Sequence, residues 1–185
     1  YYPELGTVYT FDGYSEQTIE SGGGNIFGTE LQFALPLNVV AGFLDGFGLI
    51  GYYTHLDNNV KVNNQQANII GLSDESYGIT AYFEKMGFEA RVSGNYRSEY
   101  TAEVRGGNNG LQNTSVLATE LWDAQIGYDF GRGGFSGALG GLAVFLSGTN
   151  LTNEPYVQFE HDDERQITRY SNYGRNYQLG LRYKF

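Results

Sequence analysis

The chain of 185 residues is acidic, with 11 Lys and Arg against 21 Asp and Glu and a formal net charge of −10. This balance, without any basic cluster, argues against a nucleic-acid-binding protein, because phosphate contacts need grouped Lys and Arg. The sequence has no Cys, which excludes disulfides and thiolate metal sites, and it combines 27 Gly with 16 Tyr and 12 Phe. Gly suits tight turns, whereas Tyr and Phe suit strands and membrane interfaces, so the composition indicates an all-β protein.

Alternation of apolar and polar residues predicts strands along most of the chain. A strand is expected at 6–20, and the clearest alternation follows at 27–35, 77–84, 88–97, 122–130 and 177–185, with less cleanly sided strands at 47–59 and 141–153. Successive strand side chains point to opposite sides of a sheet, so each segment has one apolar and one polar face. These segments make about eight strands, and many reach the roughly 9–11 residues with which a β-strand crosses a bilayer.

The predicted connections alternate between short and long. Short ones lie at 38–46, 84–87 and 131–140, and long polar ones lie at 57–73, 101–115 and 154–170. Outer-membrane barrels have short periplasmic turns and long extracellular loops. A soluble β-sandwich gives no reason for such a regular alternation of lengths.

The strands of a soluble β-sandwich also alternate between apolar and polar residues. Three features favour a membrane protein over such a sandwich. The apolar sets end in Tyr, Trp or Phe, as the aromatic girdles of barrels do. The polar faces carry charges in mid-strand, as a water-filled lumen does: Glu89, Arg91, Asp123 and Arg182. The chain ends on an aromatic residue of a strand. We therefore predict a transmembrane antiparallel β-barrel in a bacterial outer membrane, with a soluble sugar-binding sandwich as a distant alternative.

Several stretches resemble TonB-dependent receptors of Gram-negative bacteria. Residues 173–185 (YGRNYQLGLRYKF) resemble the last strand of these receptors, and residues 150–156 (NLTNEPY) are similar to the stretch at the top of their penultimate strand. Residues 42–49 (GFLDGFGL) with 52–54 resemble a periplasmic turn and strand, and residues 74–100 fit the same family. The resemblance covers most of 25–185 and is closest to large receptors that take up sugars or iron chelates.

The resemblance implies a 22-stranded barrel that is plugged by an N-terminal domain, binds a nutrient outside the cell and is opened by TonB. Residues 1–185 would then be the C-terminal segment of that barrel, without the plug domain and the TonB box. The implied partners are outer-membrane lipid, the rest of the barrel and its plug, the TonB complex and the barrel-insertion machinery. The implied function is active uptake of an iron chelate, a sugar or a similar nutrient, with no cofactor.

Two other interpretations stay open. The chain could form a complete eight-stranded barrel that acts as an anchor or adhesin, in which the N-terminal strand pairs with 171–185. It could also belong to an outer-membrane lipase or protease, but no Ser, His and Asp set has supporting context, so we do not expect an enzyme. The chain begins at Tyr1 without a secretion signal, which indicates a mature, processed or partial sequence.

The candidate functional residues form two groups. By the resemblance, the alternating residues of the last strand act as an assembly signal for the insertion machinery: Tyr177, Leu179, Leu181, Tyr183 and Phe185. Ligand contacts are expected from the long loops, because aromatic rings stack on sugars and Arg pairs with anionic chelates. The residues of suitable type are Tyr100, Arg105, Asn108, Asn109, Tyr156, Arg165 and Tyr170.

Three weaker signals have simpler interpretations. The run His161-Asp162-Asp163-Glu164 has carboxylates that suit a hard cation, but its spacing matches no known metal loop, so we predict a solvated loop and no metal site. His55 stands alone on a strand and is expected to be a packed or interfacial residue. Asn113 and Asn150 each begin an Asn-x-Ser/Thr pattern that we interpret as a polar loop or strand end.

Overall fold

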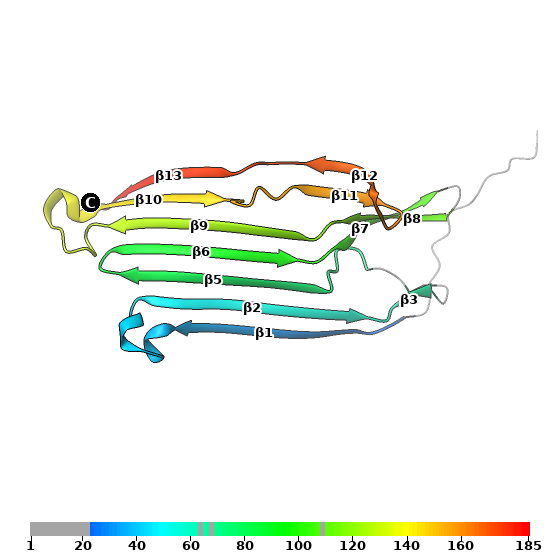
Figure 1. The fold of residues 1–185 in the computed structure, drawn as a ribbon, viewed down its shortest axis with the longest axis horizontal. Helices are drawn as coiled ribbons and strands as arrows, with labels where there is room; N and C mark the ends of the chain where they lie inside the picture. The colour runs from blue at the N-terminus through cyan, green and yellow to red at the C-terminus, as the bar shows by residue number, and fades with distance from the viewer. Residues whose placement is uncertain (1–22, 63–64, 67–68, 108–109) are drawn as a thin grey trace, which may run out of the picture.

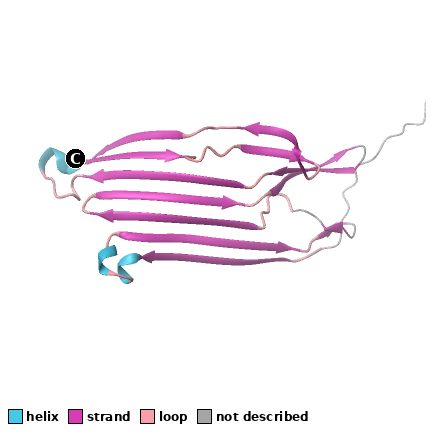
Figure 2. Cartoon of the chain, viewed as in Figure 1, coloured by secondary structure: helices cyan, strands magenta, loops and turns pink. Residues whose placement is uncertain are grey.

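The computed structural model describes residues 23–62, 65–66, 69–107 and 110–185, and this part of the chain is antiparallel β-structure (Figure 1, Figure 2). The main sheet has seven strands in the order β1-β2-β5-β6-β9-β10-β13. Their bounds are β1 Ile26–Pro36, β2 Phe47–Asn58, β5 Glu75–Lys85, β6 Phe88–Arg97, β9 Thr119–Asp129, β10 Leu142–Thr149 and β13 Asn176–Tyr183. No helix in the described ranges is long and apolar enough to span a membrane.

The strands predicted from alternation are confirmed wherever the structure describes them. The segment predicted at 27–35 forms β1, the one at 88–97 forms β6 with the same bounds, and the one at 122–130 forms most of β9. The strand expected at 6–20 lies outside the described residues. Alternation predicts these strands correctly because one face of the sheet is apolar and the other is polar, and successive residues of a strand point to opposite faces.

The connections separate by length onto opposite ends of the main sheet, as predicted. At one end, which we call the turn end, lie the 3-10 turns η2 (Leu37–Val39), η3 (Gly42–Leu44) and η4 (Gly137–Gly141) and the two-residue turn at Met86 and Gly87. Both residues of that two-residue turn have positive φ (52° and 83°), the backbone of a tight hairpin turn. All three long excursions leave from the other end, which we call the hairpin end (Figure 1).

The long connections differ from the polar loops expected there, because they fold into further strands. β7 (Tyr100–Gly107), β8 (Gly110–Val116), β11 (Tyr156–Glu160) and β12 (Asp163–Ser171) form a second sheet in the order β12-β11-β8-β7. The short pair β3 (Lys61–Val62) and β4 (Gln65–Gln66) lies in the remaining excursion. Figure 1 places these strands beyond the hairpin end of the main sheet and not over one of its faces.

The buried apolar core of the described residues lies in this second sheet. Its members are Val116, Val157 and Phe159, and Phe159 is only 1% exposed. β11 brings Val157 and Phe159 to the same side and pairs with β8 at Phe159 and Ser115. The hairpins therefore hold together by their own packing, whereas the main sheet does not enclose a core of its own.

The main sheet is open along both edges. β1 pairs with β2 and β13 pairs with β10, and among the described residues neither strand has a partner on its other side. Figure 1 shows β1 and β13 on opposite edges of the sheet. The pairing of an N-terminal strand with 171–185, which a closed eight-stranded barrel requires, is not present in the described part of the chain.

Cross-strand pairs of Gly with an aromatic ring recur through the main sheet. Gly180 lies opposite Phe145 and Gly48 opposite Tyr82, and in each case the ring covers the glycine so closely that a Cβ would contact it. The same arrangement joins Gly51 with Phe33, Gly78 with Tyr52 and Gly94 with Trp122. The pairing of many Gly with many aromatics in the composition thus has a structural cause, since a ring lying over a glycine covers the backbone that the missing side chain leaves bare.

Candidate functional site

One face of the main sheet is apolar and uncovered. The register aligns apolar residues from all seven strands on this face, among them Phe33, Leu49, Ile79, Val92, Ile126, Leu146 and Leu179. No second layer of described residues covers them, and Leu179 and Leu181 are 70% and 71% exposed. A contiguous apolar surface of this extent is a site of contact with lipid or another apolar surface.

Aromatic residues border the apolar face at both ends. Tyr53, Tyr77 and Tyr96 form a cross-strand row near the hairpin end, and the rings of Tyr77 and Tyr96 stack with centroids 4.7 Å apart. Near the turn end the register and ring contacts gather Phe88, Tyr128, Phe130, Phe135, Tyr183 and Phe185. The prediction of aromatic residues near the strand ends is therefore confirmed.

The apolar face of β5 has a long stretch without charged residues. On β5 the apolar face carries Glu75 at one end and Lys85 at the other, with no charged residue between them on that face. The ten residue steps from 75 to 85 correspond to about 33 Å of strand. In transmembrane barrels, where strands tilt by about 40°, a strand of this length spans roughly 25 Å along the membrane normal, which is the height of their apolar band.

The opposite face is polar and charged in mid-strand. The predicted residues Glu89, Arg91, Asp123 and Arg182 all lie on it. Arg91 Nη2 lies 3.6 Å from Glu84 Oε1, Arg182 Nη2 lies 3.5 Å from Asp129 Oδ2, and Thr80 and Ser93 share a hydrogen bond of 2.9 Å. Charged side chains are costly to bury in an apolar medium, so this face is better suited to water than to hydrocarbon.

The residues predicted as an assembly signal form the outermost apolar stripe of the sheet. Tyr177, Leu179, Leu181 and Tyr183 lie on β13 and pair with Gly148, Leu146, Val144 and Leu142 of β10. All four side chains and Phe185 are exposed. The stripe therefore lies on the open edge strand, where a partner strand or an insertion factor has access to it.

The Asn-Leu-Thr-Asn-Glu stretch at 150–154 joins two connections and strand β9 at the hairpin end. Asn150 Nδ2 donates to the carbonyl oxygens of Glu154 and Gly174, both at 3.2 Å, and Asn150 Oδ1 accepts from Glu154 N at 2.7 Å. The backbone N–H of Asn150 donates to Asp123 Oδ1 at 2.9 Å. Asn150 also has a φ of 53°, which Asn tolerates better than most residues. This side chain is thus a structural tie between β9, the β10–β11 link and the β12–β13 link.

The predicted ligand residues do not converge on one site. Tyr100 and Tyr156 are both half-buried, with the Arg97 guanidinium 3.7 Å from the Tyr100 ring centroid and the Arg169 guanidinium 5.6 Å from that of Tyr156. Tyr170 is exposed on the edge strand β12. Arg105 lies in β7 opposite Gln112, and Asn108 and Asn109 lie outside the described residues.

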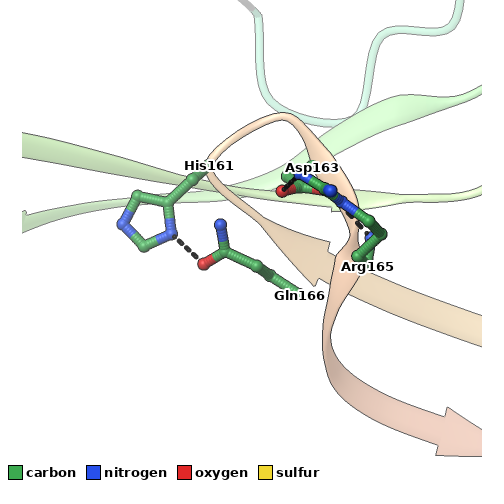
Figure 3. A network of polar contacts seen from close by, with 4 residues as sticks. All are labelled: His161, Asp163, Arg165 and Gln166. Carbon is green, nitrogen blue, oxygen red and sulfur yellow. Dashed lines mark hydrogen bonds and ion pairs between the residues drawn. The ribbon is translucent and has the colours of Figure 1, made fainter.

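Arg165 is paired at the start of β12, next to the turn that joins β11 and β12, as Figure 3 shows. Its guanidinium makes two hydrogen bonds of 2.8 Å to the Asp163 carboxylate, and its backbone N–H donates to the same group at 3.0 Å. These side-chain and backbone bonds lower the pKa of Asp163 to about 2. His161 Nδ1 lies 3.1 Å from Gln166 Oε1. The Arg165 side chain is therefore engaged in stabilising this turn through Asp163.

The structure reveals an acidic pocket that the sequence analysis missed. Asp74, Glu99 and Asp162 line a cavity of about 220 Å³ together with Asn58, Ile69, Leu72, Tyr100, Thr101 and Ser115. The pKa of the Glu99 carboxyl is raised by partial burial and then by the negative charges of Glu164 and Asp162. Asp162 belongs to the acidic run noted in the sequence, but Asp74 and Glu99 come from distant connections and no sequence pattern links them.

A second cavity lies between the polar face of the main sheet and residues 71–73. Tyr52, Asn95, Arg97 and Leu121 contribute to its walls. Arg97 holds the overlying segment, because its Nε donates to Ser73 Oγ and its Nη2 to the Gly71 carbonyl oxygen, both at 2.6 Å. The cavity is thus part of the polar face near the hairpin end.

The remaining sequence signals have ordinary structural roles. His55 lies on the apolar face at its hairpin end, with Nδ1 3.9 Å from Glu75 Oε1, as expected of an interfacial residue. Within the described residues, no group of three or more His, Asp or Glu side chains is arranged to hold a metal ion. Comparisons with protein families, characterised proteins and solved structures give no match to this chain.

Proposed function

We propose that this chain is the C-terminal part of the barrel wall of a TonB-dependent receptor in a Gram-negative outer membrane, and that the receptor imports a nutrient actively. The observation that carries the proposal is the two-faced open sheet. Its apolar face is bordered by aromatic rows and uncovered, while its opposite face carries the mid-strand charges. Lipid on one side and a wet lumen on the other satisfy both faces at once.

The open edges support a segment of a larger barrel over a complete small one. Each unpaired backbone N–H or C=O group of β1 and β13 that faces lipid raises the free energy of the folded chain by roughly several kcal/mol. Further strands of the same receptor satisfy them on both sides. The resemblance of 150–156 and 173–185 to TonB-dependent receptors supports the same assignment.

The hairpin end is the side on which ligand is expected. In outer-membrane barrels the long connections face outward and the short turns face the periplasm. The three excursions and both cavities described above lie at that end. The transported nutrient is an iron chelate, a sugar or a similar molecule too large for simple diffusion, and the protein binds and passes it without bond chemistry.

Localisation is tested by expressing the full-length polypeptide that contains this chain in a Gram-negative host. We expect the protein in the outer-membrane fraction, and we expect its extraction to require detergent. Recovery of folded monomer from the aqueous fraction without detergent would contradict the membrane assignment.

Transport is tested by growth on a panel of iron chelates and oligosaccharides, each supplied as the limiting nutrient. A strain without the gene and a strain without TonB should lose uptake of the same compound. If both strains keep the uptake of every compound that the parent takes up, the receptor function is wrong even when the localisation is right.

A further inference from the structure

The cavity between the polar face and residues 71–73, which we call the roofed cavity, is large enough for a small ligand. Its volume is about 460 Å³, within the range of roughly 300–1,000 Å³ that small-molecule pockets occupy. Strands β2, β5, β6 and β9 of the main sheet form its floor, and residues 71–73 form its roof. The question is therefore which chemistry this lining suits.

A glycine lets an aromatic ring and an amide meet on the floor of the roofed cavity. Tyr52 of β2, Gly78 of β5 and Asn95 of β6 are neighbours in one row of the register. A Cβ at Gly78 would overlap the Tyr52 ring and would lie 2.8 Å from Asn95 Oδ1, so the ring and the amide converge over this glycine. Leu121 of β9 continues the row beyond Asn95. The floor thus combines an aromatic ring, an amide and an apolar side chain.

Charge is nearly absent from this lining. Of the described residues that line the roofed cavity, Arg97 alone is charged. Its guanidinium is engaged, because Nε donates to Ser73 Oγ and Nη2 to the Gly71 carbonyl oxygen, and its Cζ lies 3.7 Å from the centroid of the Tyr100 ring. The chain as a whole has a net charge of −10. An anionic chelate therefore meets one cation that is already engaged, in a chain whose net charge repels it.

The roof is fixed from more than one side. Gly71 N donates to the Thr101 carbonyl oxygen at 2.8 Å, and Ser73 forms a β-bridge with Tyr100. Together with the two bonds from Arg97, these contacts hold the roof over the floor before any ligand enters. A preformed cavity spares the ligand the free energy of ordering the segment that covers it.

The lining suits a neutral sugar. The C–H face of a sugar ring packs on an aromatic ring, and sugar hydroxyls donate to and accept from amides and hydroxyls. Tyr52 offers the first kind of contact and Asn95 the second, while Ser76 and Thr119 lie on either side of Arg97 in the next row. A wholly apolar ligand would desolvate these polar groups without replacing their hydrogen bonds.

We propose that the roofed cavity binds a neutral sugar unit of an oligosaccharide, with the sugar ring packed on Tyr52 and its hydroxyls hydrogen-bonded to Asn95. The inference rests on the proposed function for the route by which the sugar arrives. It narrows the imported nutrient from iron chelates and sugars in general to neutral oligosaccharides.

The test uses the complete receptor, purified in a detergent without a sugar head group, and measures binding by calorimetry. Maltohexaose, xylohexaose and mannohexaose are the neutral probes, and hexagalacturonic acid and ferric citrate are the anionic ones. We expect at least one neutral hexasaccharide to bind, about tenfold or more tightly than either anionic probe. Absence of binding by all three neutral probes at millimolar concentration, or tighter binding of an anionic probe that is lost in Tyr52→Ala, would overturn the proposal.

Two tyrosines separate the roofed cavity from the rest of the polar face. Tyr52→Ala removes the ring on which the sugar packs and should weaken binding of the neutral hexasaccharide about tenfold. Tyr82→Ala is the matched control, because Tyr82 also covers a glycine of a neighbouring strand on this face, Gly48, but does not line the cavity. It should change binding less than twofold, and equal losses in the two variants would contradict the site.

A further variant tests the amide alone. Asn95→Leu keeps a side chain of similar size on the exposed floor, so the receptor should keep its unfolding temperature while binding weakens several-fold. Unchanged binding in a folded Asn95→Leu receptor would contradict the role of this amide. A receptor that binds the hexasaccharide but imports nothing would disprove the proposed function alone, and import of an iron chelate without hexasaccharide binding would disprove this inference alone.

Discussion

At the scale of single residues, the side chain of Asn150 does more than the sequence pattern indicates. In the sequence it begins an Asn-x-Thr pattern and a family-like stretch, and neither explains its role. In the structure its amide serves two carbonyl oxygens and one N–H from connections on either side of β11 and β12. The need for both a donor and an acceptor at a positive φ explains why Asn occupies this position.

We predict that Asn150→Asp lowers the free energy of unfolding by about 1–3 kcal/mol, because two carbonyl oxygens lose their donor and face a carboxylate. Hydrogen exchange over residues 172–176 should also become faster. Denaturant unfolding of the receptor and exchange mass spectrometry measure the two effects. Asn153→Asp is the matched control, since Asn153 also has a positive φ and its side chain makes no hydrogen bond with a described residue.

The Asp163–Arg165 pair makes a prediction about pH. Arg165 lowers the pKa of Asp163 to about 2 from an ordinary value of 3.8, so the stabilisation of the turn is fully present above about pH 4. It is lost as the pH falls from 3.8 through 2, because protonation removes the acceptor charge. A carbon chemical-shift titration of the Asp163 carboxyl group should give a midpoint near 2 in the receptor. A midpoint near 3.8, or no change after Arg165→Gln, would show that the brace is absent.

At the scale of elements, the strands could be predicted from sequence and the hairpins could not. β1, β6 and β9 follow from alternation because every second residue faces a different medium along nearly the whole strand. β11 is only five residues long, and Val157 and Phe159 are its only buried apolar residues. Such a short alternation inside a polar segment is too weak to separate from a loop. Its pairing with β12 is also irregular, with register shifts around Phe159.

The two faces of β9 give a prediction for a pair of neighbouring substitutions. Ile126→Lys places a charge on the apolar face and should cost about 2–4 kcal/mol near the middle of a bilayer. Gln125→Lys adds the same charge to the polar face and should change stability little. Unfolding of the receptor from lipid bilayers measures both, and similar costs for the two variants would contradict the assignment of faces.

The exposed stripe on β13 predicts an assembly defect. Deletion of Phe185 should lower the surface level of the full-length receptor several-fold, because the terminal aromatic is part of the stripe that the insertion machinery is expected to bind. Lys184→Ala, at the adjacent position of opposite parity, should leave the surface level unchanged. Protease accessibility on whole cells measures both, and normal insertion without Phe185 would remove the assembly role.

At the scale of the whole molecule, one part of the candidate site could be predicted from the sequence and another could not. The apolar face and the charged face follow from alternation, since each residue's side is set by its parity. The acidic pocket does not, because Asp74, Glu99 and Asp162 lie in three different connections and meet only through the second sheet.

The central physical claim is that one face of the main sheet contacts hydrocarbon while the other contacts water. The chain has no Cys, so single Cys residues can be introduced and spin-labelled without interference from within it. Three adjacent pairs sample both faces of the last three strands: Gln125 and Ile126, Ser147 and Leu146, and Gln178 and Leu179. In the receptor reconstituted into bilayers, labels at 126, 146 and 179 should be relaxed by oxygen and labels at 125, 147 and 178 by a water-soluble nickel chelate. Labels at 126, 146 and 179 that are shielded from oxygen, or that respond to the nickel chelate as strongly as their neighbours, would contradict the account.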